Sequence, residues 1–480
     1  MKKNGKKYRT LQKEKERRQE KRMALNITIE QEVDEINISR LSVSRILIKN
    51  PILKEKDEVK KNYVATLEKY IKLGQWNRRK CEDAELMAYK KIILESKEAS
   101  NVHDISYFKY YILLDVMHIL GYDIKKSDEV KINSIIEEYY QDFADAEVDR
   151  KLVDKLISSF KGQNKEKRVR SLMKNCDLEK ERPYIELILK NLIFMEKKPE
   201  GILVTATMSA GKSTFINALT GKYISLSQNM ACTSKIHSIV NKAFDDGYSY
   251  EYDHDLVLMA GSEELLNDNE SNESDKIVVG TYFNGYLRDQ RIIINDSPGV
   301  NFSGNTEHKE ITDKLIRRKN YHLLIYLMNA TQPETNDESE HLDFVKKTIG
   351  RTPVIFVINK IDALDVDEEN IIDFVNRRVQ FLKQKGFKNP IVCPVSSRAG
   401  YLSKKYMHDS LSKAEERELY NFVDKFNEMN IPSYYESTFK KITMCDFDKE
   451  EIQLQKTSGL AYVEKIIQLL TTGGRINGTN

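Results

Sequence analysis

The stretch Val204-Thr-Ala-Thr-Met-Ser-Ala-Gly-Lys-Ser-Thr214 passes from an apolar run through small residues to a lysine and two hydroxyls. The apolar run Gly201–Thr205 predicts a buried strand, and Ser213–Leu219 predicts a helix that ends at Gly221. Strand, loop and helix are the context that a phosphate-binding loop requires, because backbone N–H groups at a helix N-terminus bind phosphate oxygens. We therefore predict a phosphate-binding loop here.

One residue departs from the pattern G-x-x-x-x-G-K-[ST]. Its first glycine position holds Ala206, which suits the motif if that position does not need a positive φ. A pattern match of this kind can also be a chance turn, so the interpretation depends on further motifs. The loop residues predicted to contact the nucleotide are Met208, Ser209, Ala210, Gly211, Lys212, Ser213 and Thr214.

The composition is typical of a folded protein with several domains. The chain has 480 residues, of which 40% are hydrophobic. Its longest apolar stretches, Tyr321–Met328 and Tyr110–Leu114, fall far short of the roughly 18 residues that span a bilayer. Five scattered cysteines and the lack of a secretory signal indicate a reducing cytoplasm. We expect a cytoplasmic protein, with peripheral contact at the inner face of the membrane as an open alternative.

Positive charge gathers at the N-terminus. Residues 1–22 hold eleven Lys or Arg and three Glu, so this segment carries +8 in a chain whose net charge is +3. Such a tail could contact an anionic membrane surface or nucleic acid, or be a solvated extension whose glutamates dilute the field. We expect residues 1–27 to be a basic tail, with anionic membrane as an open partner and no specific nucleic acid.

Residues 28–199 are predicted to form an all-α domain, either a bundle or a stalk. The segment is highly charged and nearly free of glycine and proline, which favours helices. Apolar residues at helical spacing predict helices that start at Asp104, Ser127 and Pro183. Core packing explains these apolar stripes, and a surface that binds a partner is the alternative.

Residues 200–472 are predicted to form a mostly parallel sheet flanked by helices, because short apolar runs alternate with amphipathic segments. Insertions are expected at about 245–280 and 401–457, and residues 473–480 are expected to be a tail. Predicted helices cover Thr306–Lys319, Asp337–Ile349 and Asp367–Lys385, and a closing helix follows Ser458. The predicted strands are Ile202–Thr205, Ser238–Phe244, Ile277–Tyr282, Arg291–Asn295, His322–Met328, Val354–Ile358 and Ile391–Val395.

Three further loops follow predicted strands, at the edge of an open α/β sheet where ligands bind. The first is D-S-P-G, in which the Asp296 carboxylate can hold the water shell of Mg²⁺ and the Gly299 N–H can reach a γ-phosphate. The second is N-K-I-D, and the third is S-S-R, whose backbone N–H groups can meet a guanine carbonyl. The residues predicted to hold the base are Asn359, Lys360, Asp362, Ser396 and Ser397.

The N-K-I-D loop indicates which nucleotide is bound. The Asp362 carboxylate can accept from both N1–H and N2–H₂ of guanine, whereas adenine offers neither donor and would leave the carboxylate desolvated and unpaired. Each tetrapeptide alone is a weak signal, but the set in this order predicts GTP rather than ATP. The predicted fold class is α/β, a P-loop GTPase domain preceded by an all-α helical domain.

A switch element is expected between the first two loops. Thr233, in N-M-A-C-T-S, carries a hydroxyl and a carbonyl that could complete a Mg²⁺ site. The alternative is an ordinary threonine in a β-rich loop. The Mg²⁺ ligands predicted from these loops are Thr233 and Asp296.

These motifs resemble the G domain of dynamin-superfamily GTPases, especially bacterial dynamin-like proteins. The matching stretches are M-S-A-G-K-S-T, A-C-T, D-S-P-G, and N-A-T-Q followed by N-D, within about residues 200–472. The resemblance implies that Lys212 binds the β- and γ-phosphates, that Thr233 and Ser213 hold Mg²⁺, and that Ser209 lies beside the transferring phosphoryl. Ser209, Lys212 and Thr233 are thus the implied catalytic residues. The implied partner is a second copy through the G domains or a paralogous dynamin-like protein.

Two residues depart from what the family and Ras-type GTPases show. Met208 stands where dynamins often have a glutamine, and Val300 follows the D-x-x-G glycine, so neither side chain can orient water. We therefore expect slow hydrolysis by one molecule, completed by a second G domain. The chain ends about ten residues after the closing helix, so any stalk is expected from the N-terminal helices or from another protein.

The sequence favours a Mg²⁺-dependent dynamin-like GTPase that hydrolyses GTP to GDP and phosphate to drive assembly or switching. Two other functions stay open. One is a regulatory switch that does not assemble and acts through the helical domain. The other is a GTP-binding scaffold with little turnover in a multi-protein complex.

Overall fold

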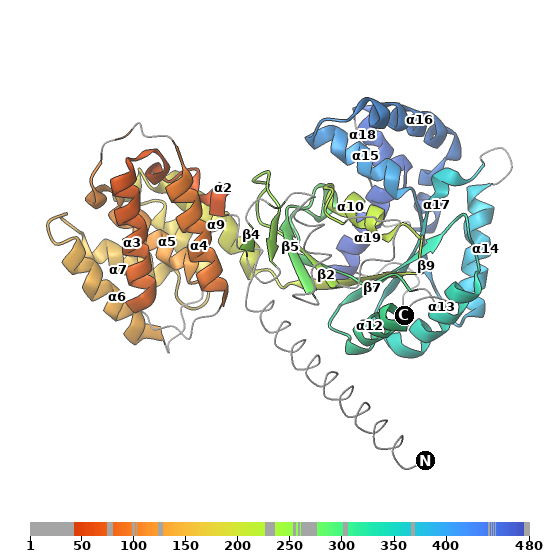
Figure 1. Cartoon of the computed structure of the whole chain (residues 1–480), viewed down its shortest axis with the longest axis horizontal. Coiled ribbons are helices and arrows are strands. Elements are labelled where there is room, and N and C mark those ends of the chain that lie inside the picture. Colours follow the sequence, from red (N-terminus) through yellow and green to blue (C-terminus); the bar gives the residue numbers. More distant parts are fainter. Residues whose placement is uncertain are drawn as a thin grey trace, which may run out of the picture. The chain divides into compact units, whose positions relative to one another are not determined.

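The computed structural model divides the chain into two units, Met1–Met195 and Glu196–Asn480 (Figure 1). The residues that it describes are 43–73, 80–97, 101, 103–122, 128–225, 236–252, 256–257, 260, 276–300, 306–365, 370–439, 442, 444, 446 and 448–474. Among them, no helix is both long and apolar enough to span a bilayer.

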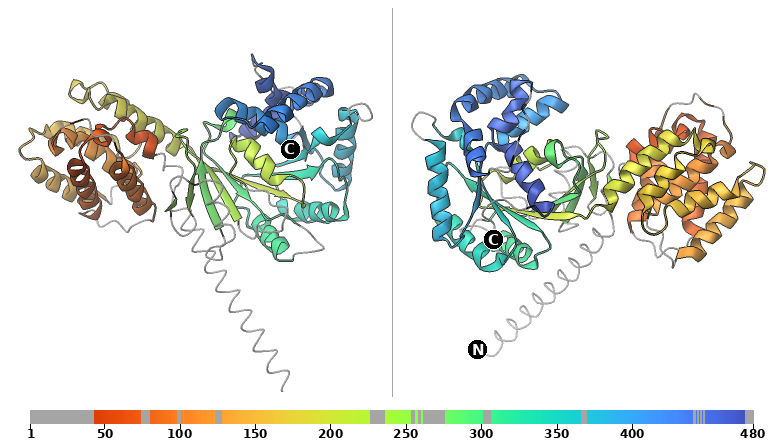
Figure 2. Two further views of the ribbon diagram at one scale, coloured as in Figure 1. Left: turned by 45° about the horizontal axis from the view of Figure 1, so that its top comes forward. Right: turned by 180° about the vertical axis from the view of Figure 1, so that it is seen from behind.

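The first unit is all α over its described residues, as the sequence predicted, and Figure 2 shows its helices in red to yellow from two further sides. Short 3-10 turns at Pro51–Lys54, Ile105–Phe108 and Cys176–Leu178 separate some of the helices. The helices are α2 (Val43–Leu47), α3 (Asp57–Leu73), α4 (Lys80–Glu95), α5 (Lys109–Ile119), α6 (Glu129–Asp142), α7 (Arg150–Ser159), α8 (Lys165–Leu172) and α9 (Arg182–Glu196).

Helix α5 is the most deeply buried helix of this unit. Every residue in Tyr110–Ile119 is buried, including Asp115 and His118. The sequence predicted one continuous helix with one apolar face from Asp104, and this is wrong in two respects. Asp104 caps a 3-10 turn, so α5 itself begins only at Lys109. The helix is also buried on every side, because neighbouring helices satisfy its polar side chains.

Asp115 is the centre of a buried polar network. Its carboxylate accepts hydrogen bonds from the hydroxyls of Tyr63, Tyr89 (3.1 Å) and Tyr184, and from the amide of Asn50 at 3.2 Å. The donors come from α3, α4, α9 and the segment before α3, so one carboxylate joins most of the unit. Burial raises the pKa of Asp115 to about 7, although these hydrogen bonds oppose the rise.

Replacing Asp115 with Asn should change how stability depends on pH. A carboxyl whose pKa is raised by folding binds more protons in the folded state, so its contribution is full below about pH 4 and is lost as pH rises through about 7. The stability difference between wild type and Asp115→Asn should therefore shift by about 4 kcal/mol across this window, since each pKa unit corresponds to about 1.4 kcal/mol. Urea denaturation of the full chain, followed by circular dichroism, measures it.

Asp154→Asn is the matched control for this measurement. Asp154 is an exposed carboxylate on α7, so its replacement should leave the pH profile of stability unchanged. If the stability difference between wild type and Asp115→Asn varied as little with pH as the difference for Asp154→Asn, the prediction would be contradicted.

Over its described residues, the second unit is built on a nine-stranded sheet in the order β4-β3-β5-β2-β6-β1-β7-β8-β9. Strands β6, β1, β7, β8 and β9 are parallel, whereas β2 is antiparallel to β6 and parallel to β5. The strands are β1 (Glu200–Ala206), β2 (Ile236–Asn241), β3 (Tyr250–Tyr252), β4 (Leu256–Val257), β5 (Lys276–Thr281), β6 (Ile292–Asp296), β7 (Leu323–Asn329), β8 (Val354–Asn359) and β9 (Ile391–Val395).

Two strand predictions needed correction. The strand predicted at Ser238–Phe244 is β2 at Ile236–Asn241, since Lys242 turns inward to bond Asp246 at 2.5 Å and the Tyr248 carbonyl at 2.7 Å. The sequence also missed β3 and β4, which lie within the insertion expected at about 245–280. They are too short to show an alternating pattern.

Helices cover both sides of this sheet, with α10 and α15 on one side and α12 and α13 on the other (Figure 1). The predicted helix Asp367–Lys385 is observed as α14; its expected first residues, 367–369, lie outside the described residues. The helices are α10 (Lys212–Thr220), α12 (Thr306–Arg318), α13 (Asn336–Ile349), α14 (Ile371–Gln384), α15 (Ser397–His408), α16 (Lys413–Met429), α17 (Ile431–Thr438), α18 (Glu450–Thr457) and α19 (Leu460–Thr471).

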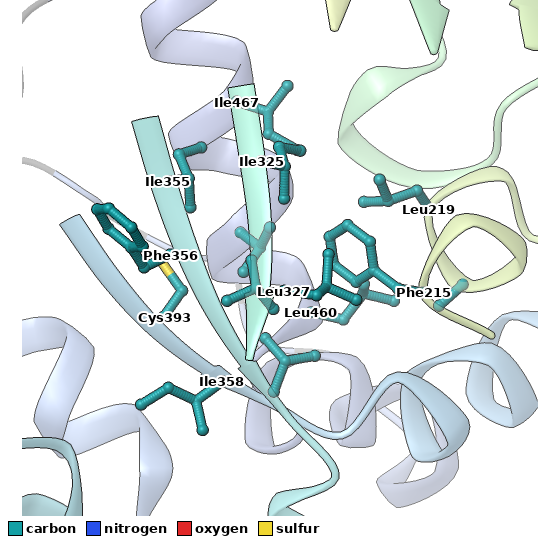
Figure 3. Close-up of a cluster of buried hydrophobic side chains, with 14 of the residues drawn as sticks. Phe215, Leu219, Ile325, Leu327, Ile355, Phe356, Ile358, Cys393, Leu460 and Ile467 are labelled. Carbon is teal, nitrogen blue, oxygen red and sulfur yellow. The ribbon is translucent and has the colours of Figure 1, made fainter. Parts of the chain in front are cut away.

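The core of this unit packs the closing helix α19 and the helix α10 against the central strands. Leu460 and Ile467 of α19 lie near Phe215 of α10 and Leu327 of β7 in one buried cluster (Figure 3). All seven residues of β7 are buried. Each large apolar side chain buried in this way contributes roughly 1.5–3 kcal/mol. This core therefore fixes the C-terminal end of β1 and the start of α10.

A buried ion pair adds a polar connection at the same helices. Lys404 of α15 donates from Nζ to Glu464 of α19 and to the carbonyls of Leu219 (2.8 Å) and Asn284 (2.9 Å). Glu464 also accepts the Tyr286 N–H at 3.1 Å. Neither charged side chain is more than 1% exposed. Removing either partner alone would leave a buried charge, which typically costs about 3–5 kcal/mol.

Candidate functional site

The predicted phosphate-binding loop lies between β1 and α10. Strand β1 ends at Ala206 and α10 begins at Lys212, one residue before the helix start that the sequence predicted. Ser209 and Gly211 have positive φ angles of 61° and 83°, whereas Ala206 is a fully buried strand residue paired with Leu327. The first glycine position of the motif therefore needs no glycine in this chain, because its backbone is extended.

Gly211 is required on two independent grounds. Its φ of +83° is in the left-handed region, which disfavours any side chain. A Cβ added at this position would also lie 2.5 Å from Nδ2 of Asn359, an atom already fixed by its own hydrogen bonds. The second glycine of the motif is thus set by close contact with the N-K-I-D loop.

Two neighbouring asparagines hold the carbonyls of the phosphate loop. Asn329 and Asn359 are register partners at the ends of β7 and β8. The Asn329 amide donates to the Ser209 carbonyl at 3.2 Å, and the Asn359 amide donates to the Ala210 carbonyl at 2.9 Å. In a trans peptide the N–H points away from the preceding C=O. The N–H groups of Ala210 and Gly211 are therefore directed away from the asparagines, as phosphate binding requires.

Asn359 also connects the phosphate loop to the S-S-R loop. Its Oδ1 accepts from the Ser397 N–H at 3.0 Å and from the Ser397 hydroxyl at 2.7 Å. The sequence predicted that backbone N–H groups of the S-S-R loop meet a guanine carbonyl, and of these the Ser397 N–H is bonded to Asn359 in this structure. Ser397 therefore supports the base loops through Asn359 in the geometry observed.

The predicted base carboxylate is held by a serine hydroxyl. Ser396 donates from Oγ to Oδ1 of Asp362 at 2.6 Å and accepts the Ala399 N–H as the cap of α15. Among the residues that the structure describes, none donates to Oδ2 of Asp362. Lys360 precedes this carboxylate with a φ of +66° and caps the 3-10 turn Ile361–Ala363. The arrangement presents a partly buried carboxylate at the end of β8.

Lys212, which is predicted to bind phosphate, lies beside Asp296, which is predicted to hold the metal. Lys212 forms an ion pair from Nζ to Asp296, whose other oxygen accepts from the Ser225 hydroxyl at 3.4 Å. Asp296 is only 5% exposed. Ser213 follows in the first turn of α10 and is half-buried with Thr214. One carboxylate and nearby hydroxyls are hard oxygen donors, a set that fits Mg²⁺ held with water and phosphate. Thr233 lies outside the described residues.

The D-S-P-G loop is attached to the phosphate loop by backbone bonds. Ser297 donates its N–H (3.2 Å) and its hydroxyl (3.0 Å) to the Val204 carbonyl. Val300 forms a parallel bridge to Thr207, and its side chain is fully buried. A Cβ added at Gly299 would meet Met208 at ordinary contact distance, 3.6 Å. Met208 itself is 43% exposed on the loop surface.

Two supporting residues were missed by the sequence analysis. Asn329 entered only as part of a resemblance, and Ser225 was not singled out. A signal for Asn329 was present, because two successive apolar strands, β7 and β8, both end in asparagine. No pattern marked Ser225, which follows α10 by a short turn and reaches Asp296 only in the folded chain.

Comparison with known proteins agrees with these motifs. Residues 202–361 match the sequence model of the Dynamin family. Over 190 residues the chain is 29% identical to the bacterial dynamin-like protein of Nostoc punctiforme (strain ATCC 29133 / PCC 73102), covering 36% of this chain and 26% of that protein. The chain thus spans about a quarter of the length of this curated relative. These matches bear out the resemblance to dynamin-family G domains over residues 202–361.

Solved structures give weaker likenesses. An oligomerised bacterial dynamin pair, described as sensing and tethering membranes, aligns with 88% of this chain and 62% of its own at 14% identity and a TM-score of 0.35. Era of Aquifex aeolicus bound to GDP and AlF4⁻ aligns with 42% and 52% at 18% identity and a TM-score of 0.26. Both scores are below 0.5, so the similarity to the dynamin family rests on the sequence matches alone.

Replacing Gly211 with Ala should abolish nucleotide binding while the protein stays folded. The added methyl would meet Asn359 and displace either the loop or the asparagine, which is expected to weaken binding of GTP and GDP by roughly 100-fold or more, the loss of two or more hydrogen bonds to charged groups. Isothermal titration calorimetry with GDP measures the affinity.

Gly247→Ala is the control, because Gly247 has nearly the same φ of +82° and no neighbour within 4 Å of an added Cβ. This control should cost only about 1–2 kcal/mol of stability and keep its affinity for GDP. Equal affinities for the two variants would show that contact with Asn359 does not matter.

Proposed function

We propose that this chain binds GTP with Mg²⁺ and hydrolyses it to GDP and phosphate. The observation that carries the proposal is the junction of four loops at the ends of β1, β6, β8 and β9. Asn359 bonds the phosphate loop and the S-S-R loop, and Lys212 bonds the D-S-P-G loop. Dynamin-family similarity over residues 202–361 supports the same function.

At the phosphate end, Lys212 is the group expected to change partner. Its ammonium is bonded to Asp296, and both side chains are largely buried. Phosphate oxygens offer the ammonium a stronger charge, so Lys212 would transfer to the β- and γ-phosphates and leave Asp296 to hold metal-bound water. Ser213 and Thr233 are the proposed hydroxyl ligands of Mg²⁺. When bound, Mg²⁺ would neutralise charge on the β- and γ-phosphates.

At the base end, Asp362 is the proposed specificity residue. Ser396 donates to one carboxylate oxygen at 2.6 Å, and we propose that this hydrogen bond orients the other oxygen for a guanine edge. Lys360, with its left-handed backbone, lies two residues before Asp362 and is proposed to line the base. The loop residues Ser209 and Gly299 are proposed to contact the transferring phosphoryl.

The attacking water is proposed to be positioned with the help of a second molecule. Val300 is fully buried and Met208 ends in a thioether, so neither side chain can orient water in this chain. Met208 is 43% exposed at the phosphate loop, where a second G domain or a paralogous dynamin-like partner could cover it.

A switch that acts without assembly and a scaffold with little turnover are the two alternative functions. We also propose peripheral membrane contact through the basic residues 1–27. Liposome sedimentation would test this contact.

Turnover measured against protein concentration tests the proposed assembly. If a second G domain completes the site, GTP hydrolysed per molecule should rise several-fold as the concentration increases by about two decades, as mass action requires. Phosphate release is the readout, and Lys212→Ala provides the inactive background. A rate per molecule that stays constant would favour the switch, and binding without turnover would favour the scaffold.

Asp362→Asn tests the proposed base recognition. An amide can donate where the carboxylate accepted, so the variant should lose roughly tenfold or more in affinity for GTP and gain affinity for XTP, whose base carries a carbonyl at the corresponding position. Competition of both nucleotides against fluorescent GDP measures the preference. An unchanged preference for GTP would refute the assignment of Asp362.

A further inference from the structure

Helix α16 contacts the backbone of the N-K-I-D loop through one side chain. Lys425 donates from Nζ to the Asp362 carbonyl at 2.7 Å and to the Leu364 carbonyl at 2.8 Å. These carbonyls lie at the end of the 3-10 turn Ile361–Ala363, where the turn leaves acceptors unsatisfied and the backbone dipoles favour a cation. The lysine is thus placed where it completes the turn that carries the proposed specificity carboxylate.

The same helix is also attached to the S-S-R loop. Arg398, the residue after Ser397, forms a bidentate pair with Glu418 of α16, with Nε and Nη2 at 2.9 Å and 2.6 Å from the two carboxylate oxygens. Because Ser396 in turn bonds the Asp362 side chain, α16 fixes both the backbone and the side chain of that residue.

The loop borders an open hollow on the side of Lys425. A cavity of about 510 Å³ lies beside the loop and is lined by Ala363, Leu364, Asp365, Asn421, Asp424, Lys425 and Glu428. Ile361 and Leu364 belong to the same buried cluster as Leu419 and Phe426 of α16, and the two hydrogen bonds of Lys425 add a polar attachment beside this apolar packing. The cavity also leaves room for substitutions at Lys425.

We propose that Lys425 is a positioning residue for guanine recognition, which it performs by holding the backbone of Asp362 at the distance that the base requires. The inference rests on the proposed binding of GTP, and it assigns part of the base specificity to a helix outside the recognised motifs. Loss of the lysine should leave the Asp362 carboxylate less firmly positioned. Binding should weaken most for guanine, because this base donates two hydrogen bonds to the carboxylate.

Lys425→Met tests this, since it keeps the length of the side chain and removes the donor. The affinity for GTP and GDP should fall by about tenfold, the order of one lost hydrogen bond to a charged group, while the rate at saturating GTP stays unchanged. The affinity for ITP, whose base lacks the 2-amino group, should fall less, so the GTP-to-ITP preference decreases. Lys425→Arg should restore the affinity for GTP, because its guanidinium can donate to both carbonyls.

Arg417→Met is the matched control for charge and helix, because Arg417 is exposed on the same helix. It should bind GTP and ITP as the wild type does. Equal losses of affinity for GTP and ITP in Lys425→Met would show a general loss of structure. Affinities equal to those of Arg417→Met would show that Lys425 has no role in base recognition. Either result would overturn this inference and leave the proposed function standing. Failure of the wild type to bind guanine nucleotides would overturn the proposed function as well.

Discussion

The amide of Asn359 is the contact on which the proposed site depends. A phosphate-binding loop needs its N–H groups turned to the ligand, and this chain obtains that orientation by fixing the opposite carbonyls. Asn359 and its register partner Asn329 supply the two donors, and Gly211 gives the close approach. Because Asn359 also bonds Ser397, the phosphate end and the base end of the site are positioned by one side chain.

The sequence predicted most of the second unit because its signals are local. Strand, loop and helix around Gly211 and the apolar run before Asp296 are continuous stretches, and both were observed where the patterns put them. Contacts between distant segments left no such trace. Lys425 acts on Asp362 across 63 positions of the chain, and nothing in either local sequence indicates the pairing. Short strands such as β3 were missed because they have too few residues to show an alternating pattern.

The helical unit shows a second limit of sequence patterns. Apolar spacing predicted its helices, and the structure confirms an all-α region. The same spacing did not single out Asp115, which is fully buried among Tyr63, Tyr89 and Tyr184. A carboxylate can be buried only if donors from other helices surround it, and the tertiary arrangement alone reveals those donors.

The buried pair Lys404–Glu464 has a consequence for cooperativity. Lys404 of α15 bonds the Leu219 carbonyl in the last turn of α10, and Glu464 belongs to the closing helix. If the closing helix frayed on its own, Glu464 would leave and the Lys404 ammonium would stay buried without its carboxylate partner. Partial opening of this segment therefore carries the cost of an unpaired buried charge, about 3–5 kcal/mol, in addition to the packing that it loses, which couples α19 to α15 and α10. Residues near the end of the chain are in this way part of the same folding unit as the phosphate loop.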